Sequence, residues 1–232
     1  MKPSLLRRVV AEFLGTAFLV AAVVGSGIMA ERLSGGNVAL ALLANTIATG
    51  AALVALILAF APISGAHFNP VVSLADAIEG GLAWRETPAY IFAQVLGGIA
   101  GTVLAHFMFS LPLVSFSRHA RSGPAQVFSE FVATFGLMCV IWGCARSRSQ
   151  PNAVAFAVGS YIAAAYWFTA STSFANAAVT IARSLSDTFA GIRPQDVLPF
   201  AGAQVAGGVA ATFLFRWLGR AAGSVRGTEQ SS

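Results

Sequence analysis

Hydrophobic residues dominate this chain in long runs, and short polar stretches separate the runs. Six runs are each about 20 residues long, which is the length that an α-helix needs to cross the hydrocarbon core of a bilayer. They cover residues 9–30, 38–61, 89–110, 127–145, 153–171 and 199–218. The pattern therefore predicts an all-α membrane protein with six transmembrane helices.

The composition excludes an ordinary water-soluble domain. Hydrophobic residues make up 56% of the 232 residues and charged residues 10%, whereas soluble domains carry about 25% charged residues. Basic residues precede the first run, as in a signal peptide, but this run is long enough to span and is expected to be retained. The two cysteines, Cys139 and Cys144, have no metal-site spacing and are expected to be small apolar fillers.

The 14 basic residues predict the orientation of the chain, because cytoplasmic loops are enriched in Lys and Arg. One side carries Lys2, Arg7, Arg8, Arg85, Arg146, Arg148, Arg216, Arg220 and Arg226, and the other carries Arg32, Arg118, Arg121, Arg183 and Arg193. We therefore expect both termini in the cytoplasm, which an even number of crossings requires. These residues lie beside the spans, so the net charge of +5 does not indicate nucleic-acid binding.

The two halves of the chain resemble each other. AEFLGTAFLV at 11–20 matches SEFVATFGLM at 129–138, and AQVLGGIAGTVLAHF at 93–107 matches AQVAGGVAATFLFRW at 203–217. We expect a first repeat over 1–126, a second over 127–221 and a disordered tail over 222–232. Three spans per repeat place the second repeat upside down in the membrane, and inverted repeats carry their site near the midplane.

Each repeat also contains a segment too short to cross a bilayer. HFNPVVSLADAI and FANAAVTIARSL predict half-helices over 69–78 and 176–187. Asn69 and Asn176 are favoured cap residues, and Pro70 occupies a first helical position. Two half-helices that meet at their N-termini form a positive midplane with two amide donors. This arrangement is typical of a pore that passes neutral hydroxylated molecules and excludes cations.

The motifs AEFLGT, SGAHFNP and SFANAAVTIARS carry a resemblance to the aquaporin and aquaglyceroporin (major intrinsic protein) family along almost the entire chain. The resemblance implies a homotetramer with one pore per subunit. Its pore asparagine motifs are Asn69, Pro70 and Val71 in the first repeat and Asn176, Ala177 and Ala178 in the second. Val71 replaces the usual Ala and Ala177 the usual Pro, and we expect both changes to be tolerated.

Two acids lie inside predicted spans, at matching positions of the two repeats. Such residues are functional by default, for example as proton carriers. The resemblance implies instead that Glu12 and Glu130 accept backbone N–H groups of the re-entrant loops. Gln94 and Gln204 are expected to bond neighbouring helices, and His67 is expected to be a loop histidine near the cytoplasmic mouth.

The resemblance also implies a selectivity filter, which spacing from the asparagines places at Thr49, Ala164, Ser173 and Val179. The usual filter Arg is absent, because Val179 occupies its position. Arg183 lies one helical turn further on, about 5.4 Å away, and is not expected to substitute. The four positions predict a wide, moderately apolar filter without a fixed cation.

Val179, FANAAVTIAR and SDTFAGIRP resemble the bacterial arsenic-resistance aquaglyceroporins. The implied function is a passive channel of the bacterial inner membrane for arsenite as As(OH)₃, with methylated arsenicals in addition. A general glycerol, urea or water facilitator, an ion-coupled transporter and a non-conducting structural protein are the alternatives. His67, His106 and His119 are scattered, so we expect no enzyme activity, metal site or cofactor.

Overall fold

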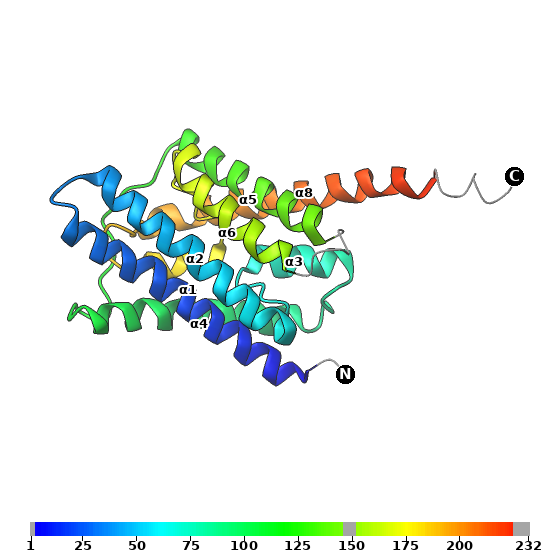
Figure 1. Ribbon diagram of the computed structural model, residues 1–232, viewed down its shortest axis with the longest axis horizontal. Helices are drawn as coiled ribbons and strands as arrows, with labels where there is room; N and C mark the ends of the chain where they lie inside the picture. Colours follow the sequence, from blue (N-terminus) through cyan, green and yellow to red (C-terminus); the bar gives the residue numbers. More distant parts are fainter. Residues whose placement is uncertain (1–2, 146–151, 225–232) are drawn as a thin grey trace, which may run out of the picture.

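The computed structural model describes residues 3–145 and 152–224, and in this part of the chain it contains eight α-helices (Figure 1). They are α1 (Leu5–Leu33), α2 (Val38–Ser64), α3 (Pro70–Glu79), α4 (Thr87–Met108), α5 (Pro124–Ala145), α6 (Ala153–Phe168), α7 (Ala177–Arg183) and α8 (Pro194–Ser224). Six helices are long and two, α3 and α7, are short. The order of long and short helices is the same in both halves, as the sequence predicts.

Five of the six long helices are long and apolar enough to cross a membrane by themselves. The sixth, α6, has 16 residues and rises about 24 Å. It ends at Phe168, three residues before the predicted end, because Thr169 adopts an extended backbone. The Thr169 hydroxyl donates to the carbonyl of Ala165 at 2.6 Å and so satisfies a carbonyl of the last turn.

The packing repeats between the two halves. In the first half α1 packs against α2 and α4, and in the second α5 packs against α6 and α8, while α2 and α6 join the halves. Figure 1 shows that α1 begins and α8 ends at the same end of the bundle, as an even number of crossings requires. The chain is therefore arranged as two copies of one helical unit.

Several predicted boundaries differ from the structure by a few residues. The fourth long helix, α5, begins at Pro124, before the predicted boundary at residue 127. The last helix continues to Ser224, so residues 222–224 are helical and the prediction of disorder is wrong for them. Residues 225–232 of the predicted tail lie outside the described part of the chain.

Matching glycines allow the long helices of each half to approach closely. A side chain at Gly97 would collide with the Phe13 carbonyl of α1, and one at Gly207 would collide with the Phe131 carbonyl of α5. Because dispersion contacts and small residues drive helix association in lipid, these contacts stabilise α1 on α4 and α5 on α8.

The neighbouring glycines seat the short helices. Gly98 of α4 faces the backbone of Ala178 on α7, and Gly208 of α8 faces the Val71 side chain on α3. Each half-helix thus rests on the last long helix of the other half. This exchange brings both half-helices to the centre of the bundle, where α3 and α7 contact each other.

The second half-helix is shorter than predicted. It ends at Arg183 rather than at residue 187, and the chain then turns. The carbonyls of Ser184 and Leu185 accept, at 3.0 Å each, the backbone N–H groups of Ser117 and Ser115 in the loop between α4 and α5. These two carbonyls therefore have hydrogen-bond partners outside the helix, which allows the helix to end at Arg183.

Candidate functional site

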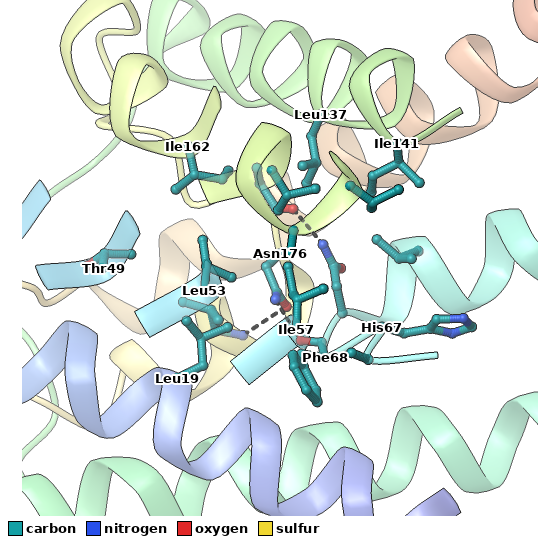
Figure 2. A pocket seen from close by; sticks show the side chains of 18 of the residues that line it. Leu19, Thr49, Leu53, Ile57, His67, Phe68, Leu137, Ile141, Ile162 and Asn176 are labelled. Carbon is teal, nitrogen blue, oxygen red and sulfur yellow. Dashed lines mark hydrogen bonds between the residues drawn. The ribbon is translucent and has the colours of Figure 1, made fainter. Parts of the chain in front are cut away.

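A cavity of about 450 Å³ runs along the centre of the bundle and passes both half-helices. Its wall includes Thr49 near the middle of α2 and Pro62 near the C-terminal end of that helix. Thirteen residues of helix correspond to about 20 Å, which is most of the roughly 30 Å of a hydrocarbon core. Figure 2 shows the cavity between Thr49 at one end and His67 at the other.

Branched aliphatic side chains from both halves form most of the wall. In Figure 2, Leu137, Ile141 and Ile162 lie across the cavity from Leu19 and Leu53. The same wall includes Val23, Ile57 and Val158. Such a surface offers nothing to replace the hydration shell of an ion, so it favours neutral solutes.

Two asparagines supply polar groups where the half-helices meet. Asn69 caps α3 by accepting the backbone N–H of Val71 at 3.0 Å. Asn176 caps α7 by accepting the backbone N–H groups of Ala178 at 3.0 Å and Val179 at 3.2 Å. The cap bonds fix both side chains where they line the cavity.

The side-chain nitrogens of these asparagines cross between the halves. Asn69 donates from Nδ2 to the Ala175 carbonyl, and Asn176 donates from Nδ2 to the Phe68 carbonyl, both at 2.7 Å. Figure 2 draws these bonds as dashed lines. An amide nitrogen carries two hydrogens, so each asparagine retains one that is not used in this bond. A solute that passes both residues therefore meets two oriented donors.

The loops before the half-helices have an unusual backbone. Ala66 and Phe68 have φ values of 51° and 50°, and the matching Ser173 and Ala175 have φ values of 49° and 47°. Left-handed backbone is unfavourable for residues other than glycine and persists only where the surroundings impose it. Its repetition in both halves indicates that the same contacts impose it twice.

Glu12 supplies these contacts in the first half. Its carboxylate accepts the backbone N–H groups of His67 at 3.0 Å and Phe68 at 2.7 Å, and the Ser64 hydroxyl at 2.6 Å. Gln94 donates from Nε2 to the same carboxylate at 2.8 Å and to the Ser73 hydroxyl of α3, also at 2.8 Å. The buried charge is thus surrounded by donors, which is the condition for its burial.

Glu130 repeats the arrangement in the second half. It accepts the backbone N–H groups of Phe174 at 2.9 Å and Ala175 at 2.8 Å. Gln204 donates from Nε2 to Glu130 at 2.6 Å and to the Thr180 hydroxyl of α7 at 2.9 Å. Neither acid lines the cavity. Their hydrogen bonds connect the long helices with the re-entrant loops, while Gln94 and Gln204 contact the half-helices.

Comparison with known proteins agrees with this architecture. The major intrinsic protein family model matches residues 1–152, which is more than half of the chain. The chain belongs to the major intrinsic protein family. Members of this family that are named aquaglyceroporins are channels rather than enzymes, and the chain is a multi-pass membrane protein with a channel for small solutes.

Individual relatives cover most of the chain. It is 58% identical to aquaglyceroporin AqpS of Rhizobium meliloti (strain 1021), over 92% of this chain and 91% of that protein. It is 35% identical to aquaporin NIP1-4 of Oryza sativa subsp. japonica, over 88% and 75% of the two chains. The structure of the aquaglyceroporin from Plasmodium falciparum superposes with a TM-score of 0.70 at 23% identity, over 92% and 95% of the chains. At this level of sequence identity, the similarity to the Plasmodium falciparum structure shows a shared fold.

Three of the four predicted filter residues, Thr49, Ser173 and Val179, are buried and line the cavity of this major intrinsic protein. The fourth prediction, Ala164, is wrong. Ala164 is exposed on the outside of α6, whereas Ile162 and Tyr166 of the same helix line the cavity. Residues two apart on a helix point about 200° apart, so a count of twelve residues back from Asn176 selected the wrong face.

Sequence reasoning also missed Tyr166, which donates from its hydroxyl to the Thr49 hydroxyl at 3.3 Å. The spacing of Val158, Ile162 and Tyr166 was the available signal, because residues four apart share one helix face. The two hydroxyl groups place a polar pair in a wall that is otherwise mostly aliphatic.

The expectation of a filter without a fixed cation concerns the four predicted positions, whereas the cavity carries a cation at another position. Arg183 lines it, one turn beyond Val179, and is 2% exposed. A second arginine, Arg121, lies in the loop between α4 and α5 and is 8% exposed. Burial lowers the pKa of Arg121 to about 10, which leaves this side chain protonated at neutral pH.

The substituted motif residues are accommodated without a break in the cavity. Val71 does not line it but packs against Gly208 of α8 instead of narrowing the centre. Ala177 is the first residue of α7, and Asn176 still caps that helix with two hydrogen bonds. At the other end, the His67 ring lines the cavity and its Nδ1 lies 3.0 Å from the Ser73 hydroxyl.

Proposed function

We propose that this channel conducts arsenite as neutral As(OH)₃, together with methylated arsenicals of similar size. The observation that carries the proposal is the combination of Val179 with hydroxyl and amide groups in an aliphatic wall. At the position of the usual filter Arg the passage carries an apolar side chain. A solute with three hydroxyl groups and an apolar centre is complementary to such a wall.

The polar groups would act in sequence on a passing solute. Thr49 and Ser173 present oxygens that accept hydroxyl protons, and Ser173 Oγ is buried without a hydrogen-bond partner among the described residues. Asn69 and Asn176 then present amide hydrogens to the solute oxygens at the meeting point of the half-helices. Each hydrogen bond lost with water is replaced by one with the wall, which keeps the barrier for a neutral polyhydroxyl solute low.

Passive flux is supported over ion-coupled transport. A coupled transporter needs a titratable acid in the passage, and Glu12 and Glu130 lie outside the cavity wall with both carboxylate oxygens bonded. A non-conducting structural role is not favoured either, because the cavity continues past both asparagines.

The test is solute uptake into proteoliposomes that contain the purified protein. Arsenite entry should be faster than in protein-free liposomes at neutral pH and should not depend on membrane potential. Glycerol and urea entry measured on the same preparation distinguishes an arsenite channel from a general facilitator. Arsenite entry at the protein-free rate, with normal glycerol entry, would refute the arsenite proposal and leave a glycerol facilitator.

The assembly and orientation belong to the same proposal. We propose a homotetramer in the bacterial inner membrane with one passage per subunit and both termini in the cytoplasm. The basic residues Arg7, Arg8 and Arg85 support this orientation. Native mass spectrometry should give four copies, and a cysteine placed at Ser4 should react with an impermeant thiol reagent only from the cytoplasmic side.

A further inference from the structure

The side chains of two buried arginines, Arg121 and Arg183, form no ion pair in the described part of the chain. Within residues 3–145 and 152–224, the ion pairs involve Arg8, Arg118, Arg193, Arg216 and His67, and neither Arg121 nor Arg183 takes part in one. Both arginines lie next to Phe174, with their guanidinium carbons 5.0 Å and 3.4 Å from the ring centre. Buried charges are normally paired, so this absence needs an explanation.

The two arginines differ in how the protein uses their hydrogens. Arg121 donates to the carbonyls of Gly191 at 2.9 Å and Ser171 at 3.2 Å, and to the Thr172 hydroxyl at 3.3 Å. Arg183 donates from Nε to the Ala190 carbonyl, and its two Nη atoms make no hydrogen bond with the described residues. Arg183 is also the one of the pair that lines the cavity. Its free donors therefore lie beside the passage.

A second polar group without a partner in the described part of the chain lines the same cavity as Arg183. The Ser173 hydroxyl is buried, at 2% exposure of the residue, and has no hydrogen-bond partner in the described part of the chain. Ser173 directly precedes Phe174, the ring on which Arg183 stacks, and it lines the same cavity. A cation without an ion-pair partner and a hydroxyl group without a hydrogen-bond partner, among the described residues, thus line one cavity.

A purely structural explanation accounts for part of this arrangement. A basic residue is favoured at the C-terminus of a helix, and Arg183 is the last residue of α7. That effect explains the charge but neither the free Nη atoms nor the unpartnered Ser173 hydroxyl. Glu130 does not neutralise the cation by contact, because its hydrogen bonds come from Phe174, Ala175 and Gln204.

We infer that Arg183 and Ser173 form a binding site for a small oxyanion of carboxylate size at the filter end of the passage. The planar guanidinium presents parallel N–H groups that match two oxygens of a carboxylate, and the Ser173 hydroxyl donates a further bond. The site rests on the channel assignment and on the cavity geometry, and it is independent of whether arsenite is the transported solute.

Saturation-transfer NMR with sodium formate tests the inference on the purified, full-length protein in detergent. Wild-type protein should transfer saturation to the formate proton in a saturable manner. Arg183→Gln should weaken formate binding about tenfold, since a charged hydrogen-bond partner is lost. Ser173→Ala should weaken it several-fold. The matched control is Arg118→Gln, because the Arg118 side chain is 91% exposed, and this variant should bind formate as the wild type does.

Size-exclusion profiles establish that the variants are assembled. If Arg183→Gln does not assemble, Ser173→Ala decides alone, because it removes a hydroxyl that has no partner to lose. Formate affinity equal to wild type in the assembled variants, or no saturable transfer in the wild type, overturns the inference. Because the readout is binding and not flux, its failure is distinguishable from a failure of the arsenite proposal.

Discussion

Asn69 and Asn176 each donate a side-chain hydrogen to the loop that carries the other asparagine, at the same distance of 2.7 Å. The acceptor of each bond is the carbonyl directly before the other asparagine. Each residue therefore caps its own half-helix and also positions the opposite one. The two halves of the channel are joined at the point where the passage needs its donors.

Asn176→Ala should lower solute flux by more than its loss of stability explains. The change removes a cap worth about 1 kcal/mol and a buried hydrogen bond worth about 1 kcal/mol, so unfolding free energy should fall by about 2 kcal/mol. Glycerol flux into proteoliposomes should fall at least tenfold, because the donor and the alignment of Phe68 are both lost.

The control for this variant is Asn37→Ala. Asn37 caps α2 in the same way, by accepting the Leu40 N–H at 3.1 Å, but it is exposed and outside the cavity. Its loss should lower stability slightly and leave flux unchanged. Equal flux in the two variants would contradict the proposed role of Asn176.

Glu130→Gln should destabilise the second re-entrant loop. The amide keeps one acceptor oxygen but turns an NH₂ group toward donors that need an acceptor, which costs roughly 2–3 kcal/mol in a buried site. We expect a lower thermal midpoint in detergent and a large loss of flux. Glu31→Gln is the matched control, since Glu31 is exposed, and it should behave as wild type. A normal midpoint for Glu130→Gln would mean that the carboxylate does not hold the loop.

The repeat made most of this architecture predictable from sequence. Glu12 and Glu130, Gln94 and Gln204, and Asn69 and Asn176 occupy matching positions, and each pair makes matching contacts. These contacts join residues that are 45 to 108 positions apart in sequence, so the matching positions of the two halves made them predictable rather than local geometry. The end of α7 was not predictable in this way, because a distant loop at Ser115 and Ser117 pairs with the carbonyls that follow it.

Val179→Arg should narrow the filter and place a second cation next to Arg183. Arsenite flux should be lost, while water flux should fall less because water is smaller. The same proteoliposomes measured by stopped-flow light scattering give both rates, and Val179→Ala serves as a size control that should retain arsenite flux. Unchanged arsenite flux in Val179→Arg would show that position 179 does not line the filter.

Ala177→Pro should leave flux within a few-fold of wild type. Asn176 bonds the N–H groups of Ala178 and Val179 and not that of Ala177, so a proline here removes no cap bond. Proline is also favoured at the first position of a helix. A tenfold change in glycerol flux would indicate that the absence of proline at position 177 changes how the second half-helix affects solute flux.

The cavity-lining residues on α6 show where prediction from the sequence fails. Spacing from a motif is reliable inside the motif, as for Val179, and loses the helix face across the non-helical stretch between Phe168 and Asn176. Ala164 was selected in this way and lies outside, whereas Ile162 and Tyr166 line the cavity. The partners of Arg183 were equally inaccessible, because Ala190 and Phe174 approach it only in the folded chain.

The location of the passage is tested most directly by glycerol flux through a pair of phenylalanine variants on α6. Ile162→Phe adds a ring inside the cavity, and Ala164→Phe adds the same ring on the exposed face two residues away. We predict flux at the protein-free baseline for Ile162→Phe and wild-type flux for Ala164→Phe, with both proteins assembled. Wild-type flux through Ile162→Phe would contradict the account, because solute would then cross by a route other than this cavity.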